Sequence, residues 1–230
     1  MPLAEPTHRR GFLARVAAGT AALAAGRALP APAAAPRAQA ASNPDKWLDG
    51  LTGKHRCLFD FPAHNAGLPL LHMFNYLKTY HDAYGTGPGE VNAIGTFYFV
   101  GPTSSIPLAF NDAMWAKYKL GEYLKLEDPK TKAPSERNMF NAPQPGDPVL
   151  FGGAFAAAGI ASLQKMGSTF LLCNNALGIL VSQLAEGTKG DAAAIDKELR
   201  ANVLPGVVTV PAMVIAIEKA QGRGIAYNRQ

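Results

Sequence analysis

One cysteine stands where a parallel α/β sheet would present a reactive group. Cys173 ends the short apolar run Ser168–Cys173 and is followed at once by Asn174, Asn175 and a helical pattern. A thiol directly before a helix lies at the positive end of the helix dipole, which favours the nucleophilic thiolate. We expect the thiol to face outward, with both asparagines capping the helix and donating hydrogen bonds to the sulfur. A free cysteine also serves as an inert core residue, so the residues alone leave both roles open.

Further candidate binding residues follow other expected strands. They are His64 and Asn65, Ser104 and Ser105, and Pro211. Because ligands of such sheets gather outside the carboxyl ends of the strands, we expect these residues to share one edge with Cys173. No histidine or aspartate is a sequence neighbour of Cys173. A Cys–His pair would therefore require the fold to bring His64 to the thiol.

The remaining patterns predict no metal and no cofactor. The chain lacks C-x-x-C, H-x-x-x-H and clustered carboxylates, which are the usual signatures of metal sites. Residues 85–90, GTGPGE, resemble a phosphate-binding loop in glycine content but precede a strand instead of opening a helix. We interpret that segment as a turn.

Short β-type runs alternate with helical patterns along most of the chain. Strands are expected at 55–61, 90–101, 168–173, 206–211 and 225–228, and helices at 65–85, 105–121, 153–167, 174–187, 191–203 and 212–224. Strands that are apolar on both faces and separated by helices belong to a parallel sheet covered on both sides. The pattern predicts an α/β fold, a three-layer α/β/α domain with a mainly parallel sheet of about five strands.

The amino-terminal segment has the features of an export signal. Thr7–Leu13 contains Arg9-Arg10, an alanine-rich stretch follows, and Ala38-Gln39-Ala40 resembles a cleavage site. We therefore divide the chain into a twin-arginine signal peptide at 1–40, a linker at 41–53 and a domain at 54–230 with an inserted loop at about 121–152. This division predicts a periplasmic protein with no stable membrane insertion after cleavage.

Charge argues against a nucleic-acid partner, and the positions of the cysteines argue against a disulfide. Most of the net charge of +5 lies in the leader, which holds five arginines and Glu5, so the remaining chain is nearly neutral and nucleic acid is not an expected partner. The only two cysteines lie early in one expected strand and at the end of another. That separation exceeds the reach of a disulfide, and Cys57 is interpreted as a core residue.

The carboxyl-terminal part resembles a known family. Residues 168–228, from STFLLCNNALGILV through VLPGVVTVPAMVIAIEKAQGRGIAYN, are similar to the DsrE/DsrF-like proteins, which include the YchN and TusD types. Residues 54–120 match by pattern alone. The resemblance implies a compact parallel-sheet fold, trimers or hexamers, and a persulfide-carrying cysteine at Cys173. The leader, the 121–152 insertion and the Asn-Asn pair after Cys173 depart from the relay members.

Two functions are expected to compete. The first is an exported sulfur carrier that holds sulfane sulfur as a persulfide on Cys173 and exchanges it with a donor or acceptor protein or a small sulfur compound. The second is a non-catalytic periplasmic protein, binding a small ligand or acting in an oligomeric assembly, in which Cys173 lines the same edge. Either protein is expected to form a homo-oligomer.

Overall fold

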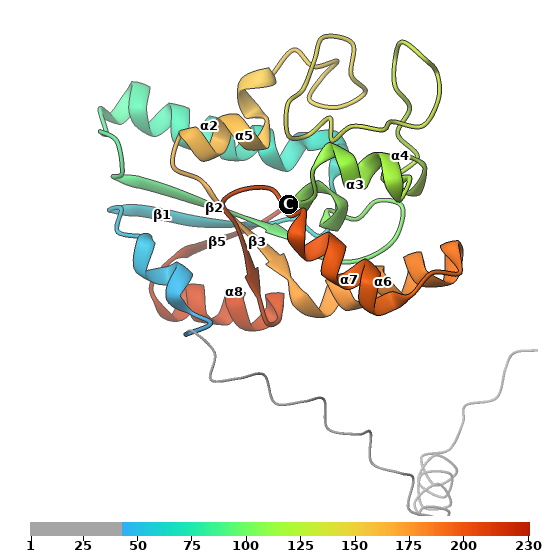
Figure 1. Cartoon of the computed structure of the whole chain (residues 1–230). Coiled ribbons are helices and arrows are strands. Elements are labelled where there is room, and N and C mark those ends of the chain that lie inside the picture. Colours follow the sequence, from blue (N-terminus) through green and yellow to red (C-terminus); the bar gives the residue numbers. More distant parts are fainter. Residues whose placement is uncertain (1–42) are drawn as a thin grey trace, which may run out of the picture. The chain divides into compact units, whose positions relative to one another are not determined.

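A computed structural model describes residues 43–230, in which a five-stranded sheet lies between two layers of helices (Figure 1). The strands are β1 His55–Asp60, β2 Val91–Phe97, β3 Thr169–Cys173, β4 Val207–Val210 and β5 Ala226–Arg229. They are arranged in the order β4-β3-β2-β1-β5, and every neighbouring pair is parallel. The predicted three-layer α/β/α fold is confirmed. The proposed signal peptide at 1–40 lies outside the described residues.

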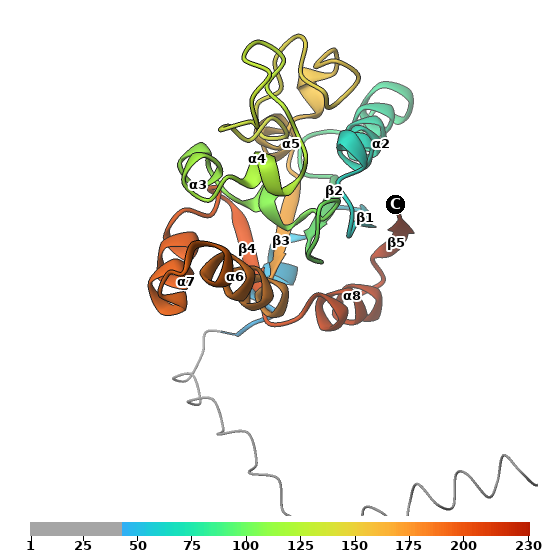
Figure 2. The same ribbon diagram turned by 90° about the vertical axis from the view of Figure 1, so that its right-hand side faces the viewer.

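The helices divide between the two faces of the sheet (Figure 2). One face carries α2 Leu68–Tyr84, α3 Asp112–Lys117, α4 Leu120–Tyr123 and α5 Ile160–Lys165. The other carries α6 Asn174–Thr188 and α8 Met213–Gly222, with α7 Ala192–Ala201 packed against α6. Short 3-10 turns lie at η1 Lys46–Gly50, η2 Asn65–Gly67, η3 Ile106–Ala109 and η4 Ala156–Ala158.

The centre of the sheet is closely packed around β2. All seven residues of β2 are buried, as expected for a strand covered on both faces. Phe97 stacks on Phe170 of β3 with ring centroids 5.0 Å apart. A Cβ at Gly95 would lie 2.6 Å from the ring of Phe170, so glycine allows this aromatic ring to approach the backbone.

Two segments expected as single helices are shorter and interrupted. The 105–121 segment contains η3, α3 and the beginning of α4, and it is broken where Lys119 adopts a left-handed conformation with φ 50°. Asn111 starts α3 because its side chain accepts a hydrogen bond from the Met114 N–H at 3.2 Å. The 153–167 segment contains η4 and α5, which meet at the extended residue Gly159.

The segments predicted as a linker and as an inserted loop are both packed against the domain. Within 41–53, the turn η1 buries Trp47 and Leu48, so this part is not a free connection. The expected loop at 121–152 begins inside α4, and most of its other residues have no regular secondary structure. It nevertheless buries Met139 and Phe140 completely. Within residues 43–230, no helix is long and apolar enough to span a bilayer.

Candidate functional site at the carboxyl edge

Cys173 lies at the boundary between two sets of strand connections. The helices that follow β1 and β2 cover one face of the sheet, and those that follow β3 and β4 cover the other (Figure 2). In open α/β sheets, ligands bind where neighbouring strands send their connections to opposite faces. Here that point lies between the carboxyl ends of β2 and β3, and Cys173 is the last residue of β3.

The thiol of Cys173 is enclosed by the beginnings of two helices. Cys173 is the N-cap residue of α6, and its Sγ accepts a hydrogen bond from the backbone N–H of Met213, 3.4 Å away at the start of α8. The first turns of α6 and α8 therefore both begin beside the sulfur. Cys173 is only 6% exposed, so the expected outward-facing position is wrong. The reason is that α8 crosses directly beneath the end of β3 (Figure 1).

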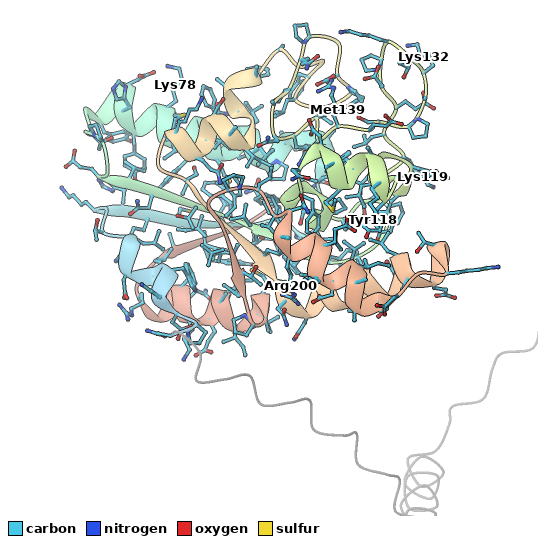
Figure 3. The ribbon with its side chains drawn as sticks, in the orientation of Figure 1. Lys78, Tyr118, Lys119, Lys132, Met139 and Arg200 are labelled. Atoms are coloured by element: carbon cyan, nitrogen blue, oxygen red, sulfur yellow. The ribbon has the colours of Figure 1, made fainter. Side chains whose placement is uncertain are left out.

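The two asparagines do not have their predicted roles in the structure. Asn174 is the first residue of α6 rather than its cap, and Asn175 is exposed. Asn174 Oδ1 accepts a hydrogen bond from Arg200 Nη2 at 2.8 Å. Arg200 belongs to α7 (Figure 3). Arg200 was missed by the sequence analysis because 26 residues separate it from Asn174. Arg200 also forms an ion pair with Asp196 of the same helix, with Nε 2.7 Å from Oδ2.

His64 and Asn65 lie on a different part of the edge. The backbone N–H of His64 donates to the Thr103 carbonyl at 2.8 Å, which joins the loops that follow β1 and β2. The His64 ring lies edge-on to Phe140, and its Nδ1 accepts a hydrogen bond from the Ala66 N–H at 3.1 Å. Burial lowers the pKa of His64, so the neutral ring is favoured. None of these interactions joins His64 to Cys173.

The remaining predicted residues are Ser104 and Ser105, in the loop after β2, and Pro211, after β4. The hydroxyl of Ser105 accepts a hydrogen bond from the Tyr98 N–H at 3.1 Å and closes the loop after β2. Ser104 is fully buried in a bridge to Ala63, and its hydroxyl has no hydrogen-bond partner among the described residues. Pro211 is exposed between β4 and α8. The structure therefore joins the β1 and β2 loops to each other, and Cys173 to the β4–α8 connection.

A buried carboxylate at the end of β1 was also missed by the sequence analysis. Asp60 is 1% exposed. Its Oδ1 accepts a hydrogen bond from the Tyr98 hydroxyl at 2.8 Å, and its Oδ2 accepts one from the Tyr227 hydroxyl at 2.6 Å. Arg229 Nη1 is 3.4 Å from the same Oδ2. A carboxylate directly after the apolar residues Cys57, Leu58 and Phe59 was the only sequence signal for this cluster.

The Asp60 cluster holds its hydroxyls protonated. Burial and the hydrogen bond to Asp60 raise the pKa of Tyr98, and the hydrogen bond to Asp60 together with burial raises the pKa of Tyr227. Tyr227 and Asp60 raise the pKa of Arg229. These residues therefore form a fixed ion pair with neutral phenols at physiological pH.

Strand register places the cluster and the thiol on one face of the sheet. Leu171 of β3 is opposite Thr96 of β2, and Cys173 lies two residues beyond Leu171. Side chains two residues apart along a strand share a face. Thr96 Oγ1 lies 3.4 Å from Asp60 Oδ1, so Asp60 points to the same face as Cys173. Both groups therefore face the layer that contains α6 and α8.

The fold and this edge define the class to which the protein belongs: a parallel α/β protein with a cysteine between two helix N-termini at the carboxyl edge of its sheet. In the part of the chain that the structure describes, no group of three or more His, Cys, Asp or Glu side chains could hold a metal ion. Both thiols, Cys57 and Cys173, are buried and free.

Comparisons with known proteins add little to this description. No family model matches the chain, and the search of curated proteins found no match. Among solved structures, the chain is similar to MTH1491 from Methanobacterium thermoautotrophicum, described as a protein of unknown function. The similarity covers 76% of this chain and 99% of that chain at 15% identity, with a TM-score of 0.38. These values support no inference about activity.

Proposed function

We propose that this protein is an exported sulfur carrier that holds sulfane sulfur as a persulfide on Cys173. The observation that carries the proposal is the position of Sγ at the end of β3, between the N-termini of α6 and α8 and hydrogen-bonded to the Met213 N–H. The resemblance of residues 168–228 to DsrE/DsrF-like proteins supports the same assignment. Arg200, bound to Asn174 and paired with Asp196, places a guanidinium beside the residue that follows Cys173.

The transfer requires no oxidant. The Cys173 thiolate attacks the outer sulfur of a donor persulfide, R–S–S–H, and a new S–S bond forms at Sγ. The donor S–S bond breaks, its electron pair leaves on R–S⁻, and the proton remains on the transferred sulfur. An acceptor thiolate then removes this sulfur by the same exchange. Because Sγ is almost enclosed, the donor must reach it past the first turn of α8.

The test is sulfur loading of the native protein. Purified mature protein is treated with polysulfide, and peptide mass spectrometry should place the added sulfur on Cys173. Cys173→Ser should lose the adduct completely, whereas Cys57→Ser, the matched control for the other buried thiol, should keep it. Modification of Cys173 only after denaturation would overturn the carrier function and favour the ligand-binding alternative.

Export and assembly belong to the same proposal. Replacement of Arg9 and Arg10 by lysine should trap the precursor in the cytoplasm, and normal export of that variant would contradict the leader assignment.

The expected homo-oligomer, a trimer or hexamer, has an apolar surface available at Phe151 and Phe155, which are 67% and 40% exposed. Light scattering should show an oligomer for the native protein and a smaller species for Phe151→Glu. A monomeric native protein would contradict this assembly.

A further inference from the structure

Two short left-handed turns lie beside each other at the carboxyl edge. Asn65, Ala66 and Gly67, which follow β1, have φ angles of 41°, 49° and 87°. Residues 150–153 have the sequence Leu-Phe-Gly-Gly, and their φ angles are 48°, 57°, 73° and 72°. Residues other than glycine rarely adopt such angles and keep them only where surrounding contacts hold the backbone. Both turns therefore depend on the contacts around them.

One hydrogen bond and one close approach join the two turns. The Leu150 N–H donates to the Ala66 carbonyl at 2.8 Å. A Cβ at Gly67 would lie 2.8 Å from Leu150 Cγ, so a side chain at this position would push the turns apart. Leu150 itself is completely buried. The position of residues 150–153 thus depends on the backbone of the first turn.

The side chain of His64 supports the first turn. Its Nδ1 accepts a hydrogen bond from the Ala66 N–H at 3.1 Å. A ring nitrogen that accepts an N–H must carry a lone pair, so the ring is neutral and its proton lies on Nε2. A proton on Nδ1 would face the Ala66 N–H with a second donor, and two donors form no hydrogen bond. His64 can therefore support this turn only while its ring is neutral.

The surroundings of His64 keep its ring neutral. Burial lowers the pKa of His64 below its ordinary value of 6.5, and a hydrogen bond to the Pro102 carbonyl opposes this effect in part. The ring packs against Phe140, which is uncharged. The loop after β2 has no charged side chain over residues 99–111. Burial is thus the main control on the protonation of this ring.

The titratable groups of the other neighbouring elements have partners of their own. On α2, His72 is hydrogen-bonded to the chain end. In the inserted segment, Arg137 pairs with Asp147. At the end of β1, Asp60 is bound by two phenols and a guanidinium. None of these groups contributes to the pKa of His64.

The second turn carries an exposed aromatic pair. Phe151 is 67% exposed and Phe155 is 40% exposed, with ring centroids 5.7 Å apart. The Phe155 N–H donates to the Leu150 carbonyl at 3.3 Å, so both rings are positioned by this turn. A change at Leu150 would therefore move the aromatic surface.

We propose that His64 is a pH-dependent latch, which holds residues 150–153 and their aromatic surface in place at neutral pH and releases them in acid. A proton on Nδ1 breaks the hydrogen bond from the Ala66 N–H. The first turn then loses its side-chain support, and its strained backbone moves toward ordinary φ angles. This movement displaces the Ala66 carbonyl, and the Leu150 N–H loses its acceptor. The latch does not depend on the sulfur chemistry of Cys173.

The test follows the Leu150 amide by hydrogen exchange and the His64 ring by NMR in the whole protein. The protection factor of Leu150 should fall about tenfold between about pH 7.5 and about pH 5, because one hydrogen bond accounts for about that factor in an opening equilibrium. Since the folded-state pKa of His64 is lowered, the support is complete above pH 6.5 and is lost as the pH falls below it. The midpoint should coincide with the titration of the His64 ring. Ile94, at the centre of β2, should stay protected throughout.

His64→Asn is the decisive variant. The amide oxygen of asparagine accepts the same N–H but does not titrate, so Leu150 should stay protected at both pH values. His81→Asn is the matched control, because His81 is exposed at the far end of α2, and it should keep the loss of protection in acid. His72→Asn should keep it as well.

Three results would overturn the latch: Leu150 protection that does not change with pH, a loss that persists in His64→Asn, or a loss that disappears in His72→Asn. The coincidence of the two midpoints in the native protein tests the latch even if His64→Asn fails to fold. Separate midpoints for the Leu150 amide and the His64 ring would contradict it. Cys173→Ser should show the same acid response as the native protein, and loss of that response would place the sensor at the thiol.

Discussion

At the β3–β4 half of the carboxyl edge, the Cys173 thiol is enclosed by the first turns of α6 and α8; at the β1–β5 half, the Asp60 carboxylate is enclosed by two phenols and Arg229. The thiol has a single hydrogen bond, from the Met213 N–H. The carboxylate uses both oxygens, and Arg229 Nη1 lies 3.4 Å from one of them. One half is thus suited to a covalent step, and the other to holding a charge in place.

The largest expected effect is at the carboxylate. Asp60→Asn should lower the free energy of unfolding by about 3 kcal/mol, because an amide cannot accept from both phenols and leaves Arg229 without its counter-ion. Urea unfolding measures this change. Asp82→Asn, at an exposed pair with Lys78, is the matched control and should change stability by less than about 0.5 kcal/mol. Equal effects in both variants would show that the cluster does not stabilise this half.

The next effect is a pH dependence of stability that comes from Cys57. Burial raises the pKa of Cys57 in β1 to about 11 from 9.0. Because the neutral thiol is favoured in the folded state, its contribution is complete below pH 9 and is lost as pH rises through about 11. The free energy of unfolding should fall by up to about 2 kcal/mol over this range. In Cys57→Ala the decline should be shallower, and identical slopes for the two proteins would contradict the assignment.

A smaller effect distinguishes the two phenols of Asp60. Tyr98→Phe should cost about 1.5 kcal/mol of stability, because it removes a hydrogen bond to a buried carboxylate. Tyr227 is 40% exposed, so water can replace its hydroxyl and Tyr227→Phe should cost about half as much. Thermal unfolding of both variants provides the comparison. A larger loss for Tyr227→Phe would mean that the edge strand β5 depends on this contact more than the core does.

The smallest expected effect is at the thiol half. Arg200→Gln should slow polysulfide loading of Cys173 by about two- to fivefold, since an exposed charge acts through screened electrostatics. The rate should become less sensitive to salt in the variant. Lys197→Gln removes a charge from the same helix and is the control. A salt dependence that survives Arg200→Gln unchanged would remove Arg200 from the site.

Much of the fold could be predicted from the sequence because its signals are local. The apolar runs around Cys57, Ile94 and Leu171 correspond to β1, β2 and β3, and the last strand–helix–strand unit lies within a residue or two of its expected bounds. The interrupted helices at 105–121 and 153–167 were missed. There, backbone conformations such as that of Lys119 override the helical pattern.

The candidate site could be predicted only in part. The position of Cys173 at a strand end is a local feature, and the structure has it there. The contacts of Asn174 and His64 could not be predicted, because each depends on a partner that is distant in the sequence. Asn174 binds Arg200, and His64 packs against Phe140. The inserted segment that supplies Phe140 was expected to be a loop, but it contributes fully buried side chains.

The sequence by itself determined the alternation of strands and helices, and with it the place of Cys173 at the carboxyl edge, because hydrophobic periodicity acts over a few residues. Only the tertiary structure decided that α8 covers the thiol. It also decided that Asp60 accepts hydrogen bonds from Tyr98 and Tyr227 and pairs with Arg229, which lie 38, 167 and 169 residues away. A buried charge is stable only with such partners, and chain folding brings them together.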